Sequence, residues 1–304
     1  MQDFDFSRLS ELSDLFSANR PIDRLAAALW VNRSFPEVGR MALFTAYFDA
    51  SGEGQENQPL VIVSGFVANF QQWGMFQSLW ERAHREAGAE LPFHMVDFMA
   101  ACNNPHYAQQ KNARADYVRL AGNPQEAKKF LHHLALSEVT ALSCGISCMV
   151  PMKLYNEVNS VLYLRELLPP YALGARMCIE KLHQWEEKFE IEEPTEYIFE
   201  SGDFEQGKFT SLMIDEGQNV PIYKSKNDFV GLQAADHYAW EQSYFIKKRQ
   251  RDPNFVARDD LGLLIYGIPK LHVEPSLEKL IKLCEIKGIK QRGVKIPDTT
   301  LRSV

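Results

Sequence analysis

The sequence predicts an α/β fold in which helices flank a mixed β-sheet. Two short apolar runs, MALFTAYFDASG from residue 41 and LVIVSGFVANF from residue 60, are separated by a polar loop, which is typical of an antiparallel hairpin. Further along the chain, strand-like segments alternate with helical ones, a pattern typical of a sheet covered by helices. Together these observations indicate one mixed sheet whose first strands are antiparallel.

Residues 1–40 precede this sheet and are predicted to form a helical extension. Leu9, Leu12 and Leu15 recur at helical spacing, and a second short helix is expected after Pro21. Because these helices are amphipathic, they are candidates for holding copies of the chain together as a homo-oligomer. The segment lacks the basic start and apolar centre of a secretion signal, which favours a cytoplasmic location.

The first helix of the main domain is expected directly after the hairpin. Asn69 is expected to cap it, and Gly88 to end it, with His84 on a solvated face. The segment LPFHMVDF, residues 91–98, is expected to be extended and to lead into a polar helical region over residues 111–136.

Residues 138–150 are expected to form a buried strand in which Cys144 and Cys148 share one face as small core side chains. The elements expected after it are a helical block over 152–190 broken at Pro169 and Pro170, a strand over 195–199, a helix over 204–215, a strand over 221–224 and a helix over 228–248. These elements complete a main domain over residues 41–250. Residues 251–304 are predicted to form a basic C-terminal extension containing one helix, over residues 275–287.

Composition narrows the class of protein. The 304-residue chain is 45% hydrophobic, which is enough to build a sizeable core. No apolar run reaches the length of about 18 residues that a membrane-spanning helix needs, so no membrane association is expected. The five cysteines include no CxxC pair, which disfavours a zinc knuckle or a disulfide framework and fits a reducing cytoplasm. Neither a glycine-rich phosphate loop nor a GxSxG nucleophile motif is present.

The charge is unevenly distributed along the chain. The net charge is −7, but residues 241–304 hold 13 lysines and arginines against 8 acids, a net charge of +5, and the remaining 240 residues have a net charge of −12. An acidic body suits a metal site, and a basic end suits a polyanion. The equal alternative is that Lys247, Lys248, Arg249 and Arg251 only solvate the end of a helix.

Three carboxylates lie where a simple apolar core would not place them. Asp49 ends one apolar strand, Glu200 ends another, and Asp236 is expected to face inward on the helix FVGLQAADHYAWE. Acids on adjacent strand ends would repel each other, and a divalent cation is the usual remedy. An all-oxygen ligand set favours Mg²⁺ or Mn²⁺. The alternative is that each acid forms a turn or caps a helix.

Neighbouring motifs supply further candidates for the same site. His94 is a candidate catalytic residue that could shuttle a proton or contact a phosphate, with a structural histidine as the alternative. Ser51, Ser225 and Lys226 are candidates for binding the substrate, and the last two directly precede the helix of Asp236. The candidates for an additional metal ligand are Asp97, Asp203 and Glu53.

The motifs YFDASG, LPFHMVDF, YIFESGD and KSKNDFVGLQAADHYAWE together resemble the domain-of-unknown-function 3800 family over residues 42–246. Members have a first strand ending in Asp-x-Ser-Gly, a segment with histidine after the first helix, and a Ser-Lys element before Leu-Gln-x-Ala-Asp. The resemblance implies a ribonuclease H-like fold in which Asp49, Glu200 and Asp236 are the acids of the first strand, a middle strand and the last helix. Ala50 departs from the glutamate that members often carry.

We therefore expect a divalent-metal-dependent nuclease that hydrolyses phosphodiester bonds in nucleic acid, with DNA and RNA both open. In this hypothesis Asp49, Glu200 and Asp236 bind one or two Mg²⁺ or Mn²⁺ ions. Two alternatives remain at this point. One is a non-catalytic ribonuclease H-like module that binds a partner, and the other is a metal-dependent phosphatase that acts on small phosphate esters.

Overall fold

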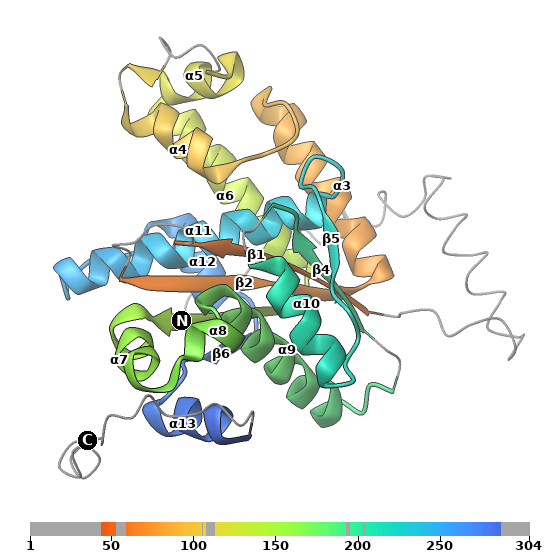
Figure 1. Ribbon diagram of the computed structural model, residues 1–304. Helices are drawn as coiled ribbons and strands as arrows, with labels where there is room; N and C mark the ends of the chain where they lie inside the picture. Colours follow the sequence, from red (N-terminus) through yellow and green to blue (C-terminus); the bar gives the residue numbers. More distant parts are fainter. Residues whose placement is uncertain are drawn as a thin grey trace, which may run out of the picture. The chain divides into compact units, whose positions relative to one another are not determined.

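The computed structural model describes residues 44–52, 59–104, 106–107, 113–192, 195–202 and 205–286. Within these ranges, six strands form one mixed sheet in the order β5-β4-β1-β2-β3-β6 (Figure 1). The strands are β1 (Phe44–Ser51), β2 (Leu60–Asn69), β3 (Cys144–Pro151), β4 (Thr195–Glu200), β5 (Ile222–Lys224) and β6 (Lys270–Val273). The predicted α/β class with a mixed sheet is confirmed. The predicted helical extension over residues 1–40, and the homo-oligomer expected through it, lie outside the described residues.

The first three strands form an antiparallel meander. β1 pairs with β2, with Asp49 opposite Ser64, and β2 pairs in turn with β3. The predicted hairpin is therefore confirmed. Gly52 follows β1 with a left-handed φ of +87°, and a Cβ there would lie 2.5 Å from the carbonyl oxygen of Leu60, so only glycine fits. The later strands are parallel to their neighbours, β4 to β1, β5 to β4 and β6 to β3.

Helices cover both faces of this sheet, which gives three layers (Figure 1). Along β2, Val61 and Val63 lie in one apolar core, whereas Phe66 and Ala68 lie in the other, because successive side chains of a strand alternate between faces. The first core is shared with α7 (Met152–Leu162), α8 (Leu164–Leu167), α9 (Pro170–Lys188), α10 (Gln206–Asp215) and α13 (Leu277–Ile286). The second core is shared with α3 (Phe70–Ala87), α4 (Met95–Asn103), α5 (Ala115–Ala121), α6 (Pro124–Ala141), α11 (Val230–Arg251) and α12 (Asp259–Tyr266). No described helix combines the length and the apolar character that crossing a bilayer requires.

The helix that follows β2 begins and ends at its predicted capping residues. The side chain of Asn69 accepts the backbone N–H of Gln72, whose own side chain accepts the backbone N–H of Asn69. At the other end, Gly88 takes a left-handed φ of +59°. Both boundaries of α3 are therefore confirmed.

The chain between β2 and β3 divides differently from its prediction. The helical region expected over residues 111–136 is two helices, because Asn123 caps a new helix with a proline in its first turn. That helix, α6, continues to Ala141, where side chains remain buried at helical spacing. The strand expected from residue 138 is therefore wrong at its start and begins at Cys144 instead. Cys144 and Cys148 are buried in the first core, as predicted.

Two further segments differ from expectation. The extended piece LPFHMVDF is extended only as far as His94, because α4 begins at Met95. The segment after residue 250, where a helical extension is predicted, also contains β6. Since β6 pairs with β3, the main sheet continues beyond residue 250. The predicted helix near the end of this segment is confirmed as α13.

His84 is buried, whereas the sequence pattern predicts a solvated face. Its ring centroid lies between 5.1 and 5.9 Å from the ring centroids of Trp80, Phe93 and Phe130. Its Nδ1 lies 2.9 Å from the carbonyl oxygen of Trp80, to which it can donate. Burial lowers the pKa of His84 to about 4, because the charged imidazolium would lose its hydration.

We expect His84 to make the folded chain sensitive to acid. The imidazole of the unfolded chain takes up a proton near its ordinary pKa of 6.5, whereas the folded chain does so only near pH 4. The free energy of unfolding therefore does not depend on His84 above pH 6.5, and it decreases by about 3 kcal/mol as the pH falls to 4. Urea unfolding of the wild type and His84→Phe at stepped pH would measure this. The variant should lose less stability across that window, and equal losses would contradict the assignment.

Candidate functional site

Asp49 and Asp236 are brought together where α11 crosses β1. Asp49 points to the α11 side of the sheet, because its neighbour Phe48 lies in the core on the opposite face. Gly231 permits the close approach of the helix, since a Cβ there would lie 2.5 Å from the ring of Tyr47. Asp49 and Asp236 are each only 6% exposed. Two of the predicted acids therefore meet in a nearly buried position.

The ammonium group of Lys226 lies between these two carboxylates. Its Nζ is 3.3 Å from Asp49 Oδ2 and 3.2 Å from Asp236 Oδ1. Burial lowers the pKa of Lys226, but the charges of Asp49, Asp236 and Glu200 outweigh burial and leave this pKa raised. The three predicted acids therefore act on one positive charge.

Each of the two aspartates has one oxygen held by a backbone N–H group. The N–H of Ala50 donates to Asp49 Oδ1, and the N–H of Met95 donates to Asp236 Oδ2, both at 2.8 Å. The other oxygen of each carboxylate faces Lys226. Because hydrogen bonds to a carboxylate are strong and directional, both aspartates are oriented toward one point by the fold itself.

Glu200 lies at the end of β4, beside the end of β1. The two strands are parallel and pair Phe48 with Phe199, so Asp49 and Glu200 are the next residues on neighbouring strands. The expectation that these strands end side by side is confirmed. The Glu200 side chain is half-buried, and its charge contributes to the raised pKa of Lys226.

His94 approaches the site at its solvent edge and holds Asp97. Its Nδ1 lies 2.9 Å from Asp97 Oδ2, and its Nε2 lies 3.8 Å from Asp236 Oδ1. The Asp97 carboxylate is half exposed and is directed to His94, not to the point between the two buried aspartates. The backbone N–H of His94 donates to the hydroxyl of Tyr117 at 3.0 Å, which fixes the start of α4.

The two serines predicted to bind substrate lie next to residues of the site in the sequence, Ser51 two residues after Asp49 and Ser225 directly before Lys226. Ser225 Oγ accepts the backbone N–H of Asn227 at 3.2 Å, and so closes the turn that carries Lys226. Ser51 is the last residue of β1 and is half-buried. Two of the predicted additional ligands lie outside the described residues, Asp203 and Glu53.

Gln233 belongs to this site, although its place in the Leu-Gln-x-Ala-Asp motif predicts no role for it. Its Oε1 accepts the N–H of Phe93 at 2.9 Å and the indole N–H of Trp80 at 3.2 Å. Its Nε2 donates to the carbonyl oxygen of Lys226 at 3.0 Å. One buried amide therefore holds the Lys226 turn and the segment before His94 in place. An amide in the otherwise apolar run VGLQAA is the signal for this role, because a buried polar group needs partners.

The donor set of the site fits a hard divalent cation. Asp49, Asp236 and Glu200 offer carboxylate oxygens, the ligands that Mg²⁺ and Mn²⁺ prefer. Among the described residues, no three His, Cys, Asp or Glu side chains form a ready-made metal-binding group. Lys226 supplies the countercharge in this arrangement, so a metal ion would have to take the place of its ammonium group.

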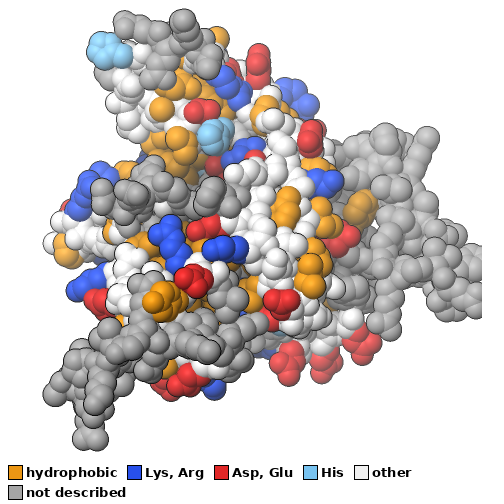
Figure 2. Space-filling view, in the orientation of Figure 1, with side chains coloured by type: hydrophobic (Ala, Val, Ile, Leu, Met, Phe, Trp, Pro, Cys, Tyr) orange, Lys and Arg blue, Asp and Glu red, His pale blue; other side chains and the backbone are white. Residues whose placement is uncertain are grey.

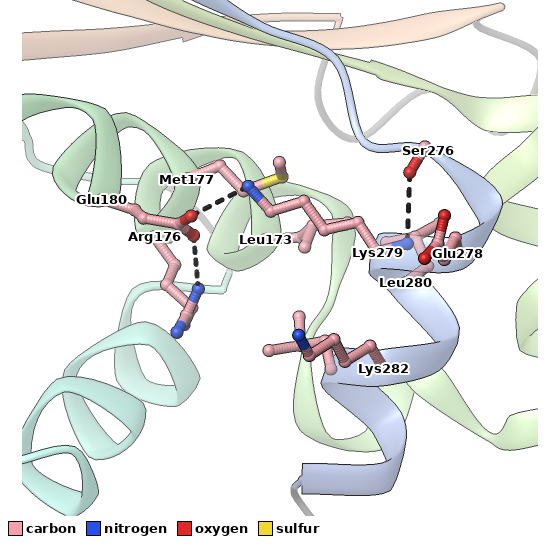
Figure 3. A pocket seen from close by; sticks show the side chains of 10 residues that line it. Leu173, Arg176, Met177, Glu180, Ser276, Glu278, Lys279, Leu280 and Lys282 are labelled. Atoms are coloured by element: carbon pink, nitrogen blue, oxygen red, sulfur yellow. Dashed lines mark hydrogen bonds and ion pairs between the residues drawn. The ribbon is translucent and has the colours of Figure 1, made fainter. Parts of the chain in front are cut away.

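A separate hollow of about 470 Å³ lies between α9 and α13 (Figure 3). Leu173 and Met177 form part of its apolar lining, and Lys279 contacts Glu180 at 2.9 Å. Both helices border the first core, whereas α11 borders the second core on the other face of the sheet. We favour the carboxylates as the functional site, because Asp49 and Asp236 are nearly buried and converge on one point, whereas Lys279 and Glu180 are both partly exposed.

No family model matches the chain, and neither does any curated protein or solved structure. The resemblance to the domain-of-unknown-function 3800 family therefore stays a prediction, and so does the ribonuclease H-like identity of the fold.

Proposed function

We propose that this protein is a divalent-metal-dependent nuclease with a ribonuclease H-like fold. The observation that carries the proposal is the convergence of Asp49 Oδ2 and Asp236 Oδ1 on one cation, the Lys226 ammonium. Two nearly buried carboxylates held toward one point are costly without a cation, and here they share the single ammonium of Lys226, so the fold maintains a position that favours positive charge.

Asp49, Asp236 and Glu200 would hold Mg²⁺ or Mn²⁺, which supplies Lewis-acid polarisation of a phosphate and a more acidic bound water. The backbone N–H groups of Ala50 and Met95 keep two of these carboxylates in place. Lys226, on the turn before α11, supplies a positive charge beside the site. When a metal ion takes the place of its ammonium group between the aspartates, Lys226 can pair with a phosphate of the substrate.

His94 has the position of a proton carrier in this proposal. Its Nδ1 is paired with Asp97, which orients the ring, and its Nε2 faces the site at 3.8 Å from Asp236. An imidazole that is oriented by a carboxylate and reaches solvent can pass a proton between the leaving oxygen and bulk water. The sheet is compatible with the proposed fold, since its first three strands are antiparallel and β4 and β5 run parallel to β1.

One observation favours a second candidate, a non-catalytic module that binds nucleic acid or a partner protein. Lys226 already neutralises the two aspartates without a metal ion. In such a module the ion pair would be a structural element of a nuclease fold that has lost its activity. The two candidates differ in their response to metal. Only in a true metal site does Mn²⁺ bind the folded chain in preference to the unfolded chain, and so stabilise the fold.

We expect the wild-type chain to cleave oligonucleotides in the presence of Mn²⁺ and not in the presence of EDTA. The substrates would be labelled single-stranded and duplex DNA and RNA, with a generic phosphate monoester beside them. Mn²⁺ should also raise the melting temperature. Hydrolysis of the monoester alone would identify a phosphatase. No cleavage, together with an unchanged melting temperature, would overturn the nuclease in favour of the binding module.

A further inference from the structure

An aromatic and basic stripe continues along α11 from the carboxylate site. Trp240, Tyr244 and Lys248 follow Asp236 at intervals of four residues, so they lie along one slowly winding side of the helix. At a rise of 1.5 Å per residue they stand about 6, 12 and 18 Å along the axis from Asp236. These three residues are called the α11 stripe below.

The two rings of the α11 stripe are stacked on each other. Their centroids are 5.0 Å apart and their planes differ by 11°. Both side chains are half-buried, so part of each ring reaches solvent. Trp240 has no second ring partner among the described residues, whereas Tyr244 also lies near Lys248 Nζ at 5.4 Å and Arg258 Cζ at 5.1 Å. Tyr244 therefore supports the indole from one side, and the indole also packs against the second core, so only the part of its ring that reaches solvent is open to a ligand.

The cations beside the stripe differ in their freedom to bind a ligand. Arg258 is held by the buried carboxylate of Glu241 and by Asp260 at 3.1 Å. Lys248 is exposed, in the basic last turn of the helix with Arg249 and Arg251. Lys248 is therefore the cation of the stripe that can meet an anionic group.

On the face shown in Figure 2, charge alone does not trace a path for a polyanion. Figure 2 shows acidic and basic side chains interspersed over the face in view, with no continuous basic surface. Flat rings beside a few cations are typical of proteins that bind single strands, because every base offers a face for stacking and the backbone needs only a positive track. A duplex stacks its bases on one another and offers none of them to a protein ring.

We propose that the α11 stripe binds single-stranded nucleic acid, with a base stacked on Trp240 and a backbone phosphate at Lys248. The inference rests on the proposed function, because it takes the bound strand to continue to a scissile phosphate at Asp49 and Asp236. Trp240 and Lys248 stand about 6 and 18 Å along the helix axis from Asp236. In this proposal both residues contact the same nucleic-acid strand, which continues to the carboxylates. The substrate class is therefore a single strand, or the unpaired end of a longer nucleic acid.

The test is the affinity of the full chain for a labelled single-stranded oligonucleotide, measured by fluorescence anisotropy in EDTA so that no cleavage occurs. Trp240→Ala should weaken binding about 10-fold, and Trp240→Phe should retain most of the affinity. Trp185→Ala is the matched control. Trp185 is also half-buried and packs against the rings of Phe44 and Phe189, and it belongs to α9 on the other face of the sheet. It should leave the affinity unchanged.

A second measurement does not depend on the folding of a variant. In this measurement, an abasic scan, a single base is removed at each position of the oligonucleotide in turn. For the wild type, removal at one position should weaken binding, because the base that stacks on Trp240 is lost. For Trp240→Ala, removal at that position should have no further effect. Lys248→Ala should reduce the slope of log affinity against log salt by about 0.7, the value for one phosphate contact of a single strand.

Equal affinity for single strands and duplexes, or an abasic scan with no sensitive position, would contradict the proposed role of the α11 stripe. In that case, cleavage by the wild type in Mn²⁺ would still support the proposed nuclease. Conversely, if binding depends on Trp240 and the chain cleaves nothing, the role of the α11 stripe is supported and the nuclease is contradicted.

Discussion

Asp236→Asn is expected to lower the rate of Mn²⁺-dependent cleavage by about 10³-fold while leaving the chain folded. An asparagine oxygen can still accept the N–H of Met95, which holds the side chain in place. The variant loses the negative charge that faces the point now taken by Lys226. Loss of about 4 kcal/mol of charge stabilisation by a metal ligand corresponds to this factor. Single-turnover cleavage and urea unfolding of the same sample would measure both effects.

The matched control for this variant is Asp215→Asn. Asp215 is an exposed acid at the end of α10, so its replacement changes the net charge equally and should keep the wild-type rate. Asp49→Asn should behave like Asp236→Asn, because the N–H of Ala50 retains an acceptor. A rate for Asp236→Asn within tenfold of the wild type would remove Asp236 from the proposed metal site.

His237→Leu is expected to destabilise the fold by about 3–5 kcal/mol. His237 and Glu138 are both fully buried, and Nδ1 of the imidazole lies 3.0 and 3.1 Å from the two oxygens of the carboxylate. Burial lowers the pKa of His237, but the charges of Glu138, Glu241 and Asp260 outweigh burial and leave this pKa raised, which favours the charged imidazole beside the carboxylate. Without it, the carboxylate is left buried and unpaired, which is the cause of the large cost.

Equilibrium urea unfolding would measure this cost, with two comparisons. His133→Leu is the matched control on α6, where His133 Nδ1 lies 3.5 Å from Glu86 Oε2 and both side chains are partly exposed. Its cost should stay below about 1 kcal/mol. The double replacement of His237 and Glu138 by leucine should recover much of the loss. If His237→Leu costs no more than His133→Leu, the buried pair does not have the role assigned to it.

The acids at the strand ends are predictable because each interrupts an apolar run. β4 ends in Glu200 and β1 carries Asp49 two residues before its end, and parallel neighbours in one sheet bring these positions together. β6 is not predictable in the same way. Its sequence, KLHV, is short and only partly buried, and its pairing with β3 depends on contacts between distant parts of the chain. A local pattern carries no trace of such a pairing.

In the candidate site, too, some residues are predictable from the sequence and others are not. Asp49 and Asp236 stand out as polar residues in apolar surroundings, whereas the N–H of Met95 that orients Asp236 is a backbone group, which every residue but proline has. His84 shows the opposite limit. Its helical position indicates a face of α3 but not the aromatic side chains that cover that face from α6 and from the segment before α4.

Both edges of the sheet are short, with three residues in β5 and four in β6. A strand edge presents unpaired N–H and C=O groups to which a strand of another molecule can add, and this addition is a route to aggregation. Here an added strand would gain few hydrogen bonds and would meet a lysine in each edge strand, Lys224 or Lys270. β1 and β4, which carry Asp49 and Glu200, are interior strands that pair with a neighbour on each side, which leaves little of their backbone for intermolecular strand addition.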